Sequence, residues 1–264
     1  MPKRRLTRLG PSVPSCSRSS RGFSLLELLV VLVITSLLTA LLFPGLRAAR
    51  ESAHRLMCAS NMRQLGTGLI LYSSDYKNRV PYSQQAERNY RLDQMALTCR
   101  NTENPNDPNE VVLDGLGLLV AGGTWGYYCD SLECLYCPSH RGVHTYDRYR
   151  DSLREKRHRL LTQSPAFGNY QYVGYRPEGT RLSDLNDGLL LLTDGFRTQD
   201  DFNHERGMNQ LFGDGSIEWW ADVDESFFLS LPLTALSDPN EQSSRFTNLW
   251  SILDFGDREI GYSE

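Results

Sequence analysis

The chain has 264 residues, 40% hydrophobic and 10% aromatic, which is enough for one domain with a buried core and argues against two domains. Its formal net charge is −4, although the first 22 residues contain six basic side chains and no acidic one. The remainder carries 22 basic and 32 acidic side chains, a net charge of −10, which argues against a general binder of nucleic acids or anionic lipids.

An apolar segment follows this basic stretch. Residues 23–43 carry one charged side chain, Glu27, and are long enough for a helix that crosses a hydrocarbon core of about 30 Å. Because basic residues precede the segment, we expect a single-pass membrane protein with a cytoplasmic N-terminus and a globular domain on the opposite side of the membrane. A lone carboxylate in lipid costs about 2.5 kcal/mol or more, so Glu27 either finds a partner or reaches water at the interface.

A secretory signal peptide is the competing interpretation of this N-terminus. The apolar core of a signal peptide is only about 7–15 residues long, with small residues at a cleavage site beyond it. The segment at 23–43 is longer and contains an acid, which favours a retained helix.

The sequence around the start of this segment, G-F-S-L-L-E-L-L-V-V from Gly22, resembles the processing and N-methylation motif of type IV prepilins and type II secretion pseudopilins. The resemblance implies that a prepilin peptidase cuts after Gly22 and methylates Phe23. It also implies that the membrane is the bacterial inner membrane and that the globular domain is periplasmic. It also implies that Glu27 pairs with the N-terminal amine of a neighbouring subunit during filament assembly. Pro44 lies where pilins commonly carry a helix-loosening proline.

Past residue 43 the pattern becomes amphipathic and predicts a stalk helix over residues 44–78. Apolar side chains recur there at a spacing close to 3.6 residues: Leu46, Ala49, Ala53, Leu56, Met57, Leu65, Leu69, Tyr72 and Tyr76. We expect one continuous helix from Phe23 to about Tyr76, ending before Pro81. Each glycine in such a helix costs up to about 1 kcal/mol relative to alanine, which indicates close packing at Gly45, Gly66 and Gly68.

Two further stretches resemble one group of pilin-like proteins from Planctomycetes and Verrucomicrobia. Residues 58–81 are similar to the segment that follows the anchor in that group, and residues 137–139, Cys-Pro-Ser, are similar to its C-P-S element. The group is known for an H-x9-DG signature near the C-terminus. His204, followed after nine residues by Asp214 and Gly215, matches that signature.

Taken physically, the residues around this signature predict a β-hairpin. Asp214 and Gly215 supply turn chemistry between two β-prone runs, and His204 is expected to hydrogen-bond the start of the hairpin. A metal or acid–base pair of His204 with Asp214 is an alternative. Calcium is another alternative for the aspartates, although no EF-hand spacing is present, at Asp184, Asp187, Asp194 and Asp214.

The fold class predicted from these elements is α+β and pilin-like, with a long N-terminal transmembrane and stalk helix packed on a small antiparallel sheet. Residues 189–194 are expected to form a buried central strand and residues 170–175 a neighbouring β-prone patch. Residues 146–161 are strongly charged, as on a solvent-exposed helix. The seven basic side chains between Arg141 and Arg159 could form a DNA-contacting patch, but a solvated face is the favoured interpretation. The tail from residue 221 is expected to pack partly against the sheet.

Five cysteines remain after residue 22. A periplasmic domain favours disulfides among them, although the sequence does not choose the pairing: Cys58, Cys99, Cys129, Cys134 and Cys137. Cys134 and Cys137, followed by His140 and His144, offer zinc-ligand spacing as an alternative, and free buried thiols are a third.

Together these observations predict a structural subunit of a type II secretion pseudopilus or type IV pilus-like filament. We expect a leader at 1–22, a transmembrane helix at 23–43, a stalk at 44–78 and a globular domain at 79–264. The expected partners are prepilin peptidase, other pilin-like subunits and the inner membrane, with no catalytic residues, cofactor, metal or nucleic acid. Two alternatives are an anchored metal-binding enzyme and an envelope sugar-binding protein with an aromatic platform of Trp125, Tyr127, Tyr128 and Tyr136.

Overall fold

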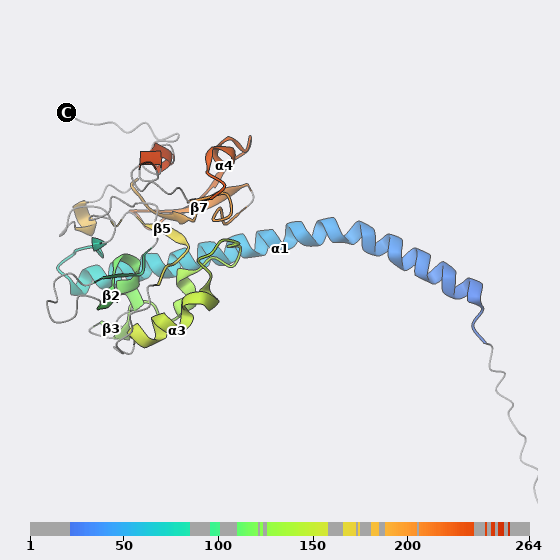
Figure 1. The fold of residues 1–264 in the computed structure, drawn as a ribbon, viewed down its shortest axis with the longest axis horizontal. Coiled ribbons are helices and arrows are strands. Elements are labelled where there is room, and N and C mark those ends of the chain that lie inside the picture. The colour runs from blue at the N-terminus through green and yellow to red at the C-terminus, as the bar shows by residue number, and fades with distance from the viewer. Residues whose placement is uncertain are drawn as a thin grey trace, which may run out of the picture. The chain divides into compact units, whose positions relative to one another are not determined.

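The computed structural model describes residues 22–84, 96–100, 110–120, 122–123, 126–157, 166–172, 174, 181–184, 188–204, 206–234, 241, 244–245, 248–250 and 253. The chain divides into two units, one ending at Ala48 and the other beginning at Ala49. Helix α1, Leu25–Asp75, contributes to both units and is blue to cyan in Figure 1. This helix confirms the continuous helix expected from the sequence to within two residues at either end.

The part of α1 in the first unit is apolar and exposed. Phe23, just before the helix, is 76% exposed, and the apolar side chains that follow are exposed as well. Among the described residues, α1 is the one helix long and apolar enough to cross a membrane, judged by length and composition. Pro44 lies inside it and cannot donate the backbone hydrogen bond to the carbonyl of Ala40 that the helix would otherwise make.

The start of α1 is closed by a capping box that the sequence analysis did not identify. The backbone N–H of Leu26 donates to Ser24 Oγ at 3.3 Å, and that of Ser24 donates to Glu27 Oε2 at 2.9 Å. These bonds satisfy two of the N–H groups that a helix start leaves without partners. Glu27 therefore has an intramolecular role in addition to any role between subunits.

In the second unit α1 buries one face in the core. Its buried apolar side chains follow each other at intervals of three and four residues: Cys58, Met62, Leu65, Leu69 and Tyr72. The predicted face was partly wrong, because Leu56 is 70% and Met57 53% exposed. The lysine and asparagine after the helix adopt left-handed backbone conformations, and the Asn78 N–H donates to the Ser73 carbonyl to end it.

Two glycines allow α1 to approach its neighbours closely. A Cβ on Gly66 would lie 3.3 Å from Leu211 of strand β7, Gly207–Phe212, and one on Gly68 would lie 3.1 Å from the carbonyl oxygen of Tyr128. The expectation of close packing is confirmed at these two positions. A Cβ on Gly45 would meet nothing within 4 Å.

The sheet confirms the α+β fold. Four antiparallel strands lie in the order β5, β6, β7, β8, and their bounds are Tyr170–Tyr172, Leu190–Asp194, Gly207–Phe212 and Ile217–Ala221. Every residue of β6 and β7 is buried, including the polar side chains of Thr193, Asp194, Asn209 and Gln210. The predicted central strand is β6, and the predicted hairpin is β7 with β8.

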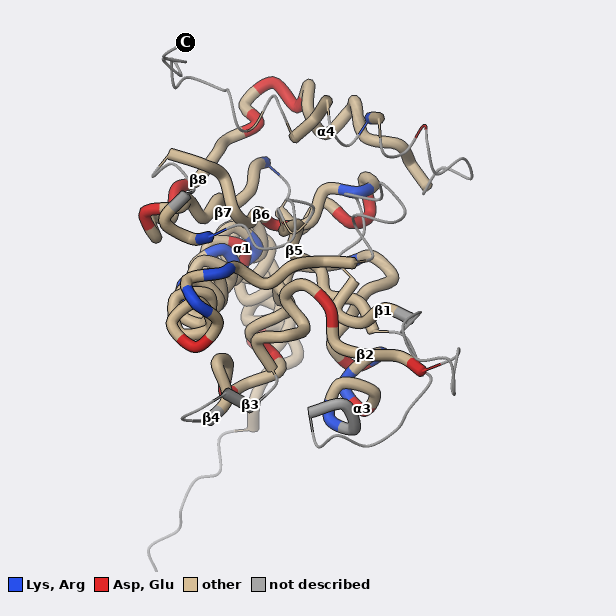
Figure 2. Tube along the Cα trace, turned by 90° about the vertical axis from the view of Figure 1, so that its left-hand side faces the viewer, with Lys and Arg blue, Asp and Glu red and all other residues tan. Residues whose placement is uncertain are grey.

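Smaller elements complete the domain. Strand pairs are β1, Thr98–Arg100, with β2, Val111–Leu113, and β3, Gly122–Gly123, with β4, Gly126–Tyr127. Short 3-10 helices are Gly115–Val120, Leu132–Leu135 and Leu182–Asp184. In Figures 1 and 2 the sheet lies on one side of the second-unit part of α1, and β2, β3 and helix α3, Tyr146–Arg157, lie on the other.

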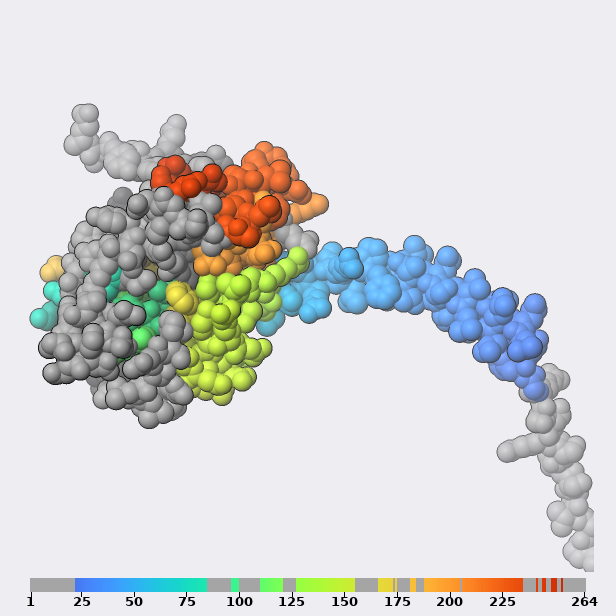
Figure 3. Space-filling view, viewed as in Figure 1, coloured from blue at the N-terminus to red at the C-terminus, as the bar shows by residue number. Residues whose placement is uncertain are grey.

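Helix α3, Tyr146–Arg157, is the charged helix expected from the sequence. It buries Tyr149 and Leu153, and its Arg150 lies 3.5 Å from Asp147 and 3.3 Å from Asp151. Figure 3 shows this segment, in yellow-green, at the surface. Its interspersed charges of both signs are those of a solvated helix face. Residues 158–161 of the predicted helix lie outside the described residues.

The C-terminal segment adds aromatic side chains to the core. Helix α4, Ser226–Ser230, buries Phe227 against Phe196 and Trp220. Trp250 and Leu253 are also buried, as the sequence predicted for part of the tail. Leu229, in the same helix as Phe227, is exposed.

Candidate functional site

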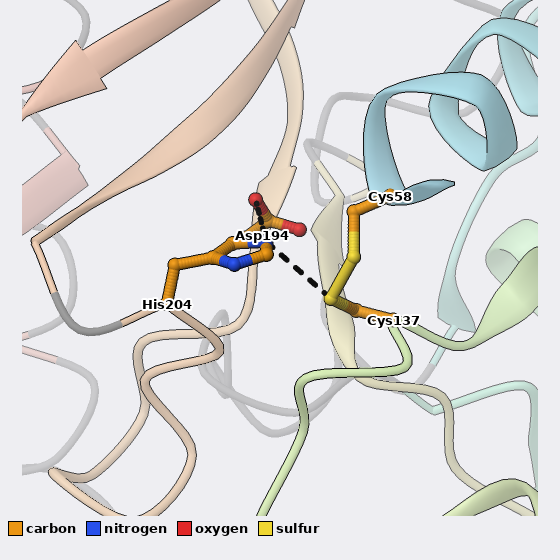
Figure 4. Close-up of side chains that lie close together, drawn as sticks. All are labelled: Cys58, Cys137, Asp194 and His204. Carbon is orange, nitrogen blue, oxygen red and sulfur yellow. Dashed lines mark hydrogen bonds and ion pairs between the residues drawn. A yellow bond between two sulfur atoms is a disulfide. The ribbon is translucent and has the colours of Figure 1, made fainter. Parts of the chain in front are cut away.

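Five side chains meet where α1 crosses the sheet, and we call this cluster the His204 junction. It consists of Glu51 and Cys58 from α1, Cys137 from the C-P-S element, Asp194 from the end of β6 and His204 from the segment before β7. Figure 4 shows four of them. The three stretches that resemble one protein group, around residues 58, 137 and 204, therefore converge on one place.

A disulfide joins Cys58 to Cys137 across 79 residues of chain. In the chain-entropy model, closing a loop of this length in the unfolded state stabilises the fold by about 4.5 kcal/mol. Both cysteines are buried, so the bond fastens α1 to the C-P-S element from inside the core.

His204 lies between two carboxylates. The residue is 1% exposed, its Nδ1 is 2.6 Å from Glu51 Oε1, and its Nε2 is 3.3 Å from Asp194 Oδ2. Its Nε2 is also 3.5 Å from Cys137 Sγ. Burial lowers the pKa of His204, but the hydrogen bonds and charges of Asp194 and Glu51 raise it by more, so the net pKa is above its usual value.

Asp194 is fully buried and held on one side by β7. Its Oδ2 accepts hydrogen bonds from the backbone N–H of Asn209 at 2.7 Å and from Asn209 Nδ2 at 2.9 Å. Its Oδ1 finds no hydrogen-bond donor among the described residues. A buried carboxylate oxygen without a hydrogen-bond donor is energetically costly. Asp194 Oδ1 is therefore the atom of the junction that could accept a further ligand.

Hydrogen bonds next to the junction hold the C-P-S element in contact with α1. Ser139 Oγ donates to Glu51 Oε2 at 3.2 Å and lies 3.3 Å from His54 Nδ1. The backbone N–H of Cys137 donates to Asn169 Oδ1 at 2.6 Å. The C-P-S element thus supplies both a disulfide partner and a hydrogen-bond donor to α1.

On the other side, β8 contacts the same part of α1. The guanidinium of Arg55 lies 3.7 Å from the ring centroid of Trp219, and the carbonyl of Arg55 accepts from Asn209 Nδ2 at 3.3 Å. The ring of Trp219 also lies 5.6 Å from that of His204. None of these contacts was predicted, because cation–π pairs between distant segments leave no spacing pattern in a sequence.

The H-x9-DG signature therefore has two separate roles. His204 was expected to hydrogen-bond the start of the hairpin, but its ring faces α1 and β6, and only its backbone bridges to Gly207. Asp214 and Gly215 lie in the β7–β8 turn, where Asp214 Oδ1 accepts from the Ser216 N–H at 2.8 Å and Gly215 has φ of +82°. The structure does not bring the side chains of His204 and Asp214 together.

The predicted zinc set is also separated. Cys134 is bonded to Cys129, and Cys137 to Cys58. His140 Nδ1 lies 2.7 Å from Asn203 Oδ1, and His144 Nδ1 lies 3.0 Å from the Tyr149 hydroxyl. Burial lowers the pKa of His140, and it lowers that of His144 to about 4. Cys99 is buried outside both disulfides, with its thiol directed to Gln84 Oε1.

Other candidate residues are placed as follows. Gly22 and Phe23 precede α1, and Glu27 lies in its first turn. Tyr128 and Tyr136 of the alternative aromatic platform are buried and Tyr127 is 40% exposed, whereas Trp125 lies outside the described residues. Of the candidate calcium ligands, Asp187 lies outside the described residues, Asp184 ends the 3-10 helix Leu182–Asp184, Asp194 ends β6, and Asp214 lies in the β7–β8 turn.

Comparison with known proteins supports the resemblances found in the sequence. Residues 17–43 match the model of the prokaryotic N-terminal methylation motif, and residues 47–201 match the family described as a protein of unknown function, DUF1559. The second match covers more than half of the chain and includes Glu51, Cys58, Cys137 and Asp194 of the His204 junction.

Curated relatives agree with the first of these matches. Type II secretion system core protein G of Pectobacterium carotovorum subsp. carotovorum is 33% identical over 106 residues, which are 40% of this chain and 62% of that protein. The protein of the same name from Dickeya chrysanthemi is 28% identical over 109 residues, 41% of this chain and 65% of that protein.

These alignments span less than two thirds of the length of either relative. No solved structure matches the chain. The chain carries a prepilin-type methylation motif, is distantly related to type II secretion system core protein G and belongs to the DUF1559 family.

Proposed function

We propose that the chain is a structural subunit of a type II secretion pseudopilus or type IV pilus-like filament. The observation that carries the proposal is the methylation motif at 17–43 followed by the exposed apolar start of α1. Prepilin peptidase would cut after Gly22 and methylate Phe23. Pilin-like proteins are typically structural, which supports an assembly role over a catalytic one.

In this account residues 1–22 are a leader and residues 23–43 span the inner membrane. The basic leader favours a cytoplasmic N-terminus, so the second unit would be periplasmic. The Cys58–Cys137 and Cys129–Cys134 disulfides support that orientation, because disulfides persist in oxidising compartments.

Subunits would associate through the apolar side chains that α1 exposes before Ala48. Glu27 would pair with the methylated amine of the next subunit, which offsets the cost of a carboxylate in lipid. Within one chain Glu27 also caps α1 through Ser24, so removing its side chain would disturb two functions at once. An experiment on assembly has to separate them.

The variant Glu27→Gln makes that separation, because glutamine can keep the capping bond to the Ser24 N–H while losing the charge. The proposal expects Glu27→Gln to be processed like the wild type in cells with prepilin peptidase and a secretion system. The variant should, however, be lost from the membrane oligomers that chemical cross-linking captures. Glu27→Ala would lose the cap as well. Oligomers of Glu27→Gln as abundant as those of the wild type would contradict the pairing.

A further inference from the structure

The His204 junction contains four potential metal-ligand atoms, two of which are sulfur atoms now bonded to each other in the disulfide. Among the described residues, four side chains each place one ligand atom so that all four atoms lie within 4.8 Å of one another: Cys58, Cys137, Asp194 and His204. All four residues are buried. We propose that, once the Cys58–Cys137 disulfide is reduced, these residues form a tetrahedral site for a zinc-class divalent cation.

The chemical types of the ligands suit such an ion. Two thiolates, an imidazole nitrogen and a carboxylate oxygen are ligands that zinc takes in proteins, at about 2.0–2.3 Å each. Ligand atoms at those distances in a tetrahedron are separated by roughly 3.5 Å, comparable with the spacing in this cluster. Reduction would release the two sulfur atoms from each other and let both turn toward the ion.

His204 is already oriented as a ligand. Its Nδ1 lies 2.6 Å from Glu51 Oε1, so this nitrogen can keep its proton and donate to the carboxylate. That leaves Nε2 directed toward Asp194 and Cys137, at 3.3 and 3.5 Å. Metal-bound histidines in proteins commonly use this arrangement, in which a carboxylate holds the other ring nitrogen and fixes the tautomer.

Asp194 supplies an independent indication. The residue is fully buried, and its Oδ1 has no hydrogen-bond donor among the described residues. Figure 4 shows the carboxylate pointing into the space between the His204 ring and the disulfide. Asn209 holds Oδ2 through two hydrogen bonds, so the carboxylate is fixed in place with one oxygen available.

The two states exclude each other chemically. A dithiol reductant transfers two electrons and two protons to the disulfide and becomes a cyclic disulfide itself, which leaves Cys58 and Cys137 as thiols. Binding of the divalent cation then displaces one proton from each thiol, and His204 binds the ion through an Nε2 that carries no proton. In either state α1 stays cross-linked to the C-P-S element, by a covalent bond in one case and by the ion in the other.

The test uses the full-length protein in detergent micelles, with Cys16→Ser and Cys99→Ser in every sample, so that the only remaining thiols are those of the two disulfides. The protein is reduced with dithiothreitol, freed of reductant by anaerobic gel filtration and titrated with Co²⁺. The proposal expects one Co²⁺ per chain with the visible absorption of a tetrahedral ion and a thiolate-to-cobalt charge-transfer band. The disulfide form should show neither signal.

Variants of the two cysteine pairs identify the site. Cys129→Ser with Cys134→Ser should leave the cobalt spectrum unchanged, whereas Cys58→Ser should abolish the two-thiolate spectrum. Glu51→Gln, on a side chain that is 33% exposed, should fold and weaken binding by about 10- to 100-fold. If the reduced protein that carries only the background substitutions Cys16→Ser and Cys99→Ser lacks these bands, or if the bands depend on Cys129 and Cys134, the proposal is overturned.

Discussion

Glu51 Oε1 and His204 Nδ1 lie 2.6 Å apart although 153 residues separate them in the chain. Cys58, two helical turns after Glu51 and on the same face of α1, forms the disulfide with Cys137. An ion pair and a covalent bond therefore hold one face of α1 to two distant loops. For a filament subunit, this attachment would carry force between the helix and the domain that it supports.

Loss of His204 should be far more costly than loss of the aspartate in the same signature. In His204→Ala, Asp194 would remain as a buried charge without its partner, which typically costs about 3–5 kcal/mol of unfolding free energy. Asp214→Ala removes one hydrogen bond in an exposed turn, a loss of about 1 kcal/mol. Urea unfolding followed by tryptophan fluorescence measures both. Equal losses would contradict the structural role assigned to His204.

The two disulfides should contribute unequally to stability. The bond between Cys58 and Cys137 closes 79 residues and the bond between Cys129 and Cys134 closes five, so chain entropy assigns them about 4.5 and about 2 kcal/mol. Paired serine substitutions at each bond, compared by thermal unfolding in the absence of metal, give the difference. A lower melting temperature for the Cys129→Ser, Cys134→Ser variant than for the Cys58→Ser, Cys137→Ser variant would contradict this prediction.

Alanine should have opposite effects at two glycines of α1. At Gly68 the added Cβ would lie 3.1 Å from the backbone oxygen of Tyr128, and overpacking of this kind costs about 1–3 kcal/mol. At Gly45 nothing lies within 4 Å, so alanine should leave the protein unchanged or stabilise the helix by up to about 1 kcal/mol. Unfolding curves of the two variants beside the wild type test the close contact directly.

His144 should reduce stability in acid. Burial is the main cause that lowers its pKa from the usual 6.5 to about 4, and the charge of Arg197 is the next. The charges of His140 and Arg148 lower the pKa further, and that of Asp201 raises it. Because the folded state then binds fewer protons than the unfolded state, the stability present above pH 6.5 falls as the pH drops toward 4, by at most about 3 kcal/mol.

His144→Phe isolates this contribution, since phenylalanine keeps the ring contacts with Tyr149 and Phe167. We expect the unfolding free energy of the variant to depend less steeply on pH than that of the wild type between neutral pH and about pH 5. Parallel pH dependences would show that His144 does not titrate differently in the folded state.

The sequence predicted the elements whose evidence is local. Apolar length and helical periodicity indicated α1, and the D-G turn between β-prone runs indicated the β7–β8 hairpin. The buried face of α1 was only partly identified, because Leu56 and Met57 fit an apolar pattern but lie on the exposed side. Cys58 and Met62 lie on the face that is buried. They pack against segments from elsewhere in the chain, which the apolar pattern of the helix alone cannot reveal.

The His204 junction could not be predicted from spacing, because its members are far apart in the chain. His204 was assigned to the nearby hairpin, whereas its side-chain partners are Glu51 and Asp194. One signal was available. Glu51 lies seven residues before Cys58, so a carboxylate shares the helix face of a cysteine that was expected to form a disulfide, and such a charge needs a partner.

The central claim is that the chain is a processed pilin-like subunit, and the N-terminus of the membrane-extracted protein tests it most directly. We would measure intact mass and N-terminal fragments with and without active prepilin peptidase, using Gly22→Leu as the blocked variant and Gly10→Leu as its control. The account predicts a chain that begins at methylated Phe23 only when the peptidase is active, for the wild type and Gly10→Leu alike. A retained leader, or cleavage between residues 40 and 49, would contradict it.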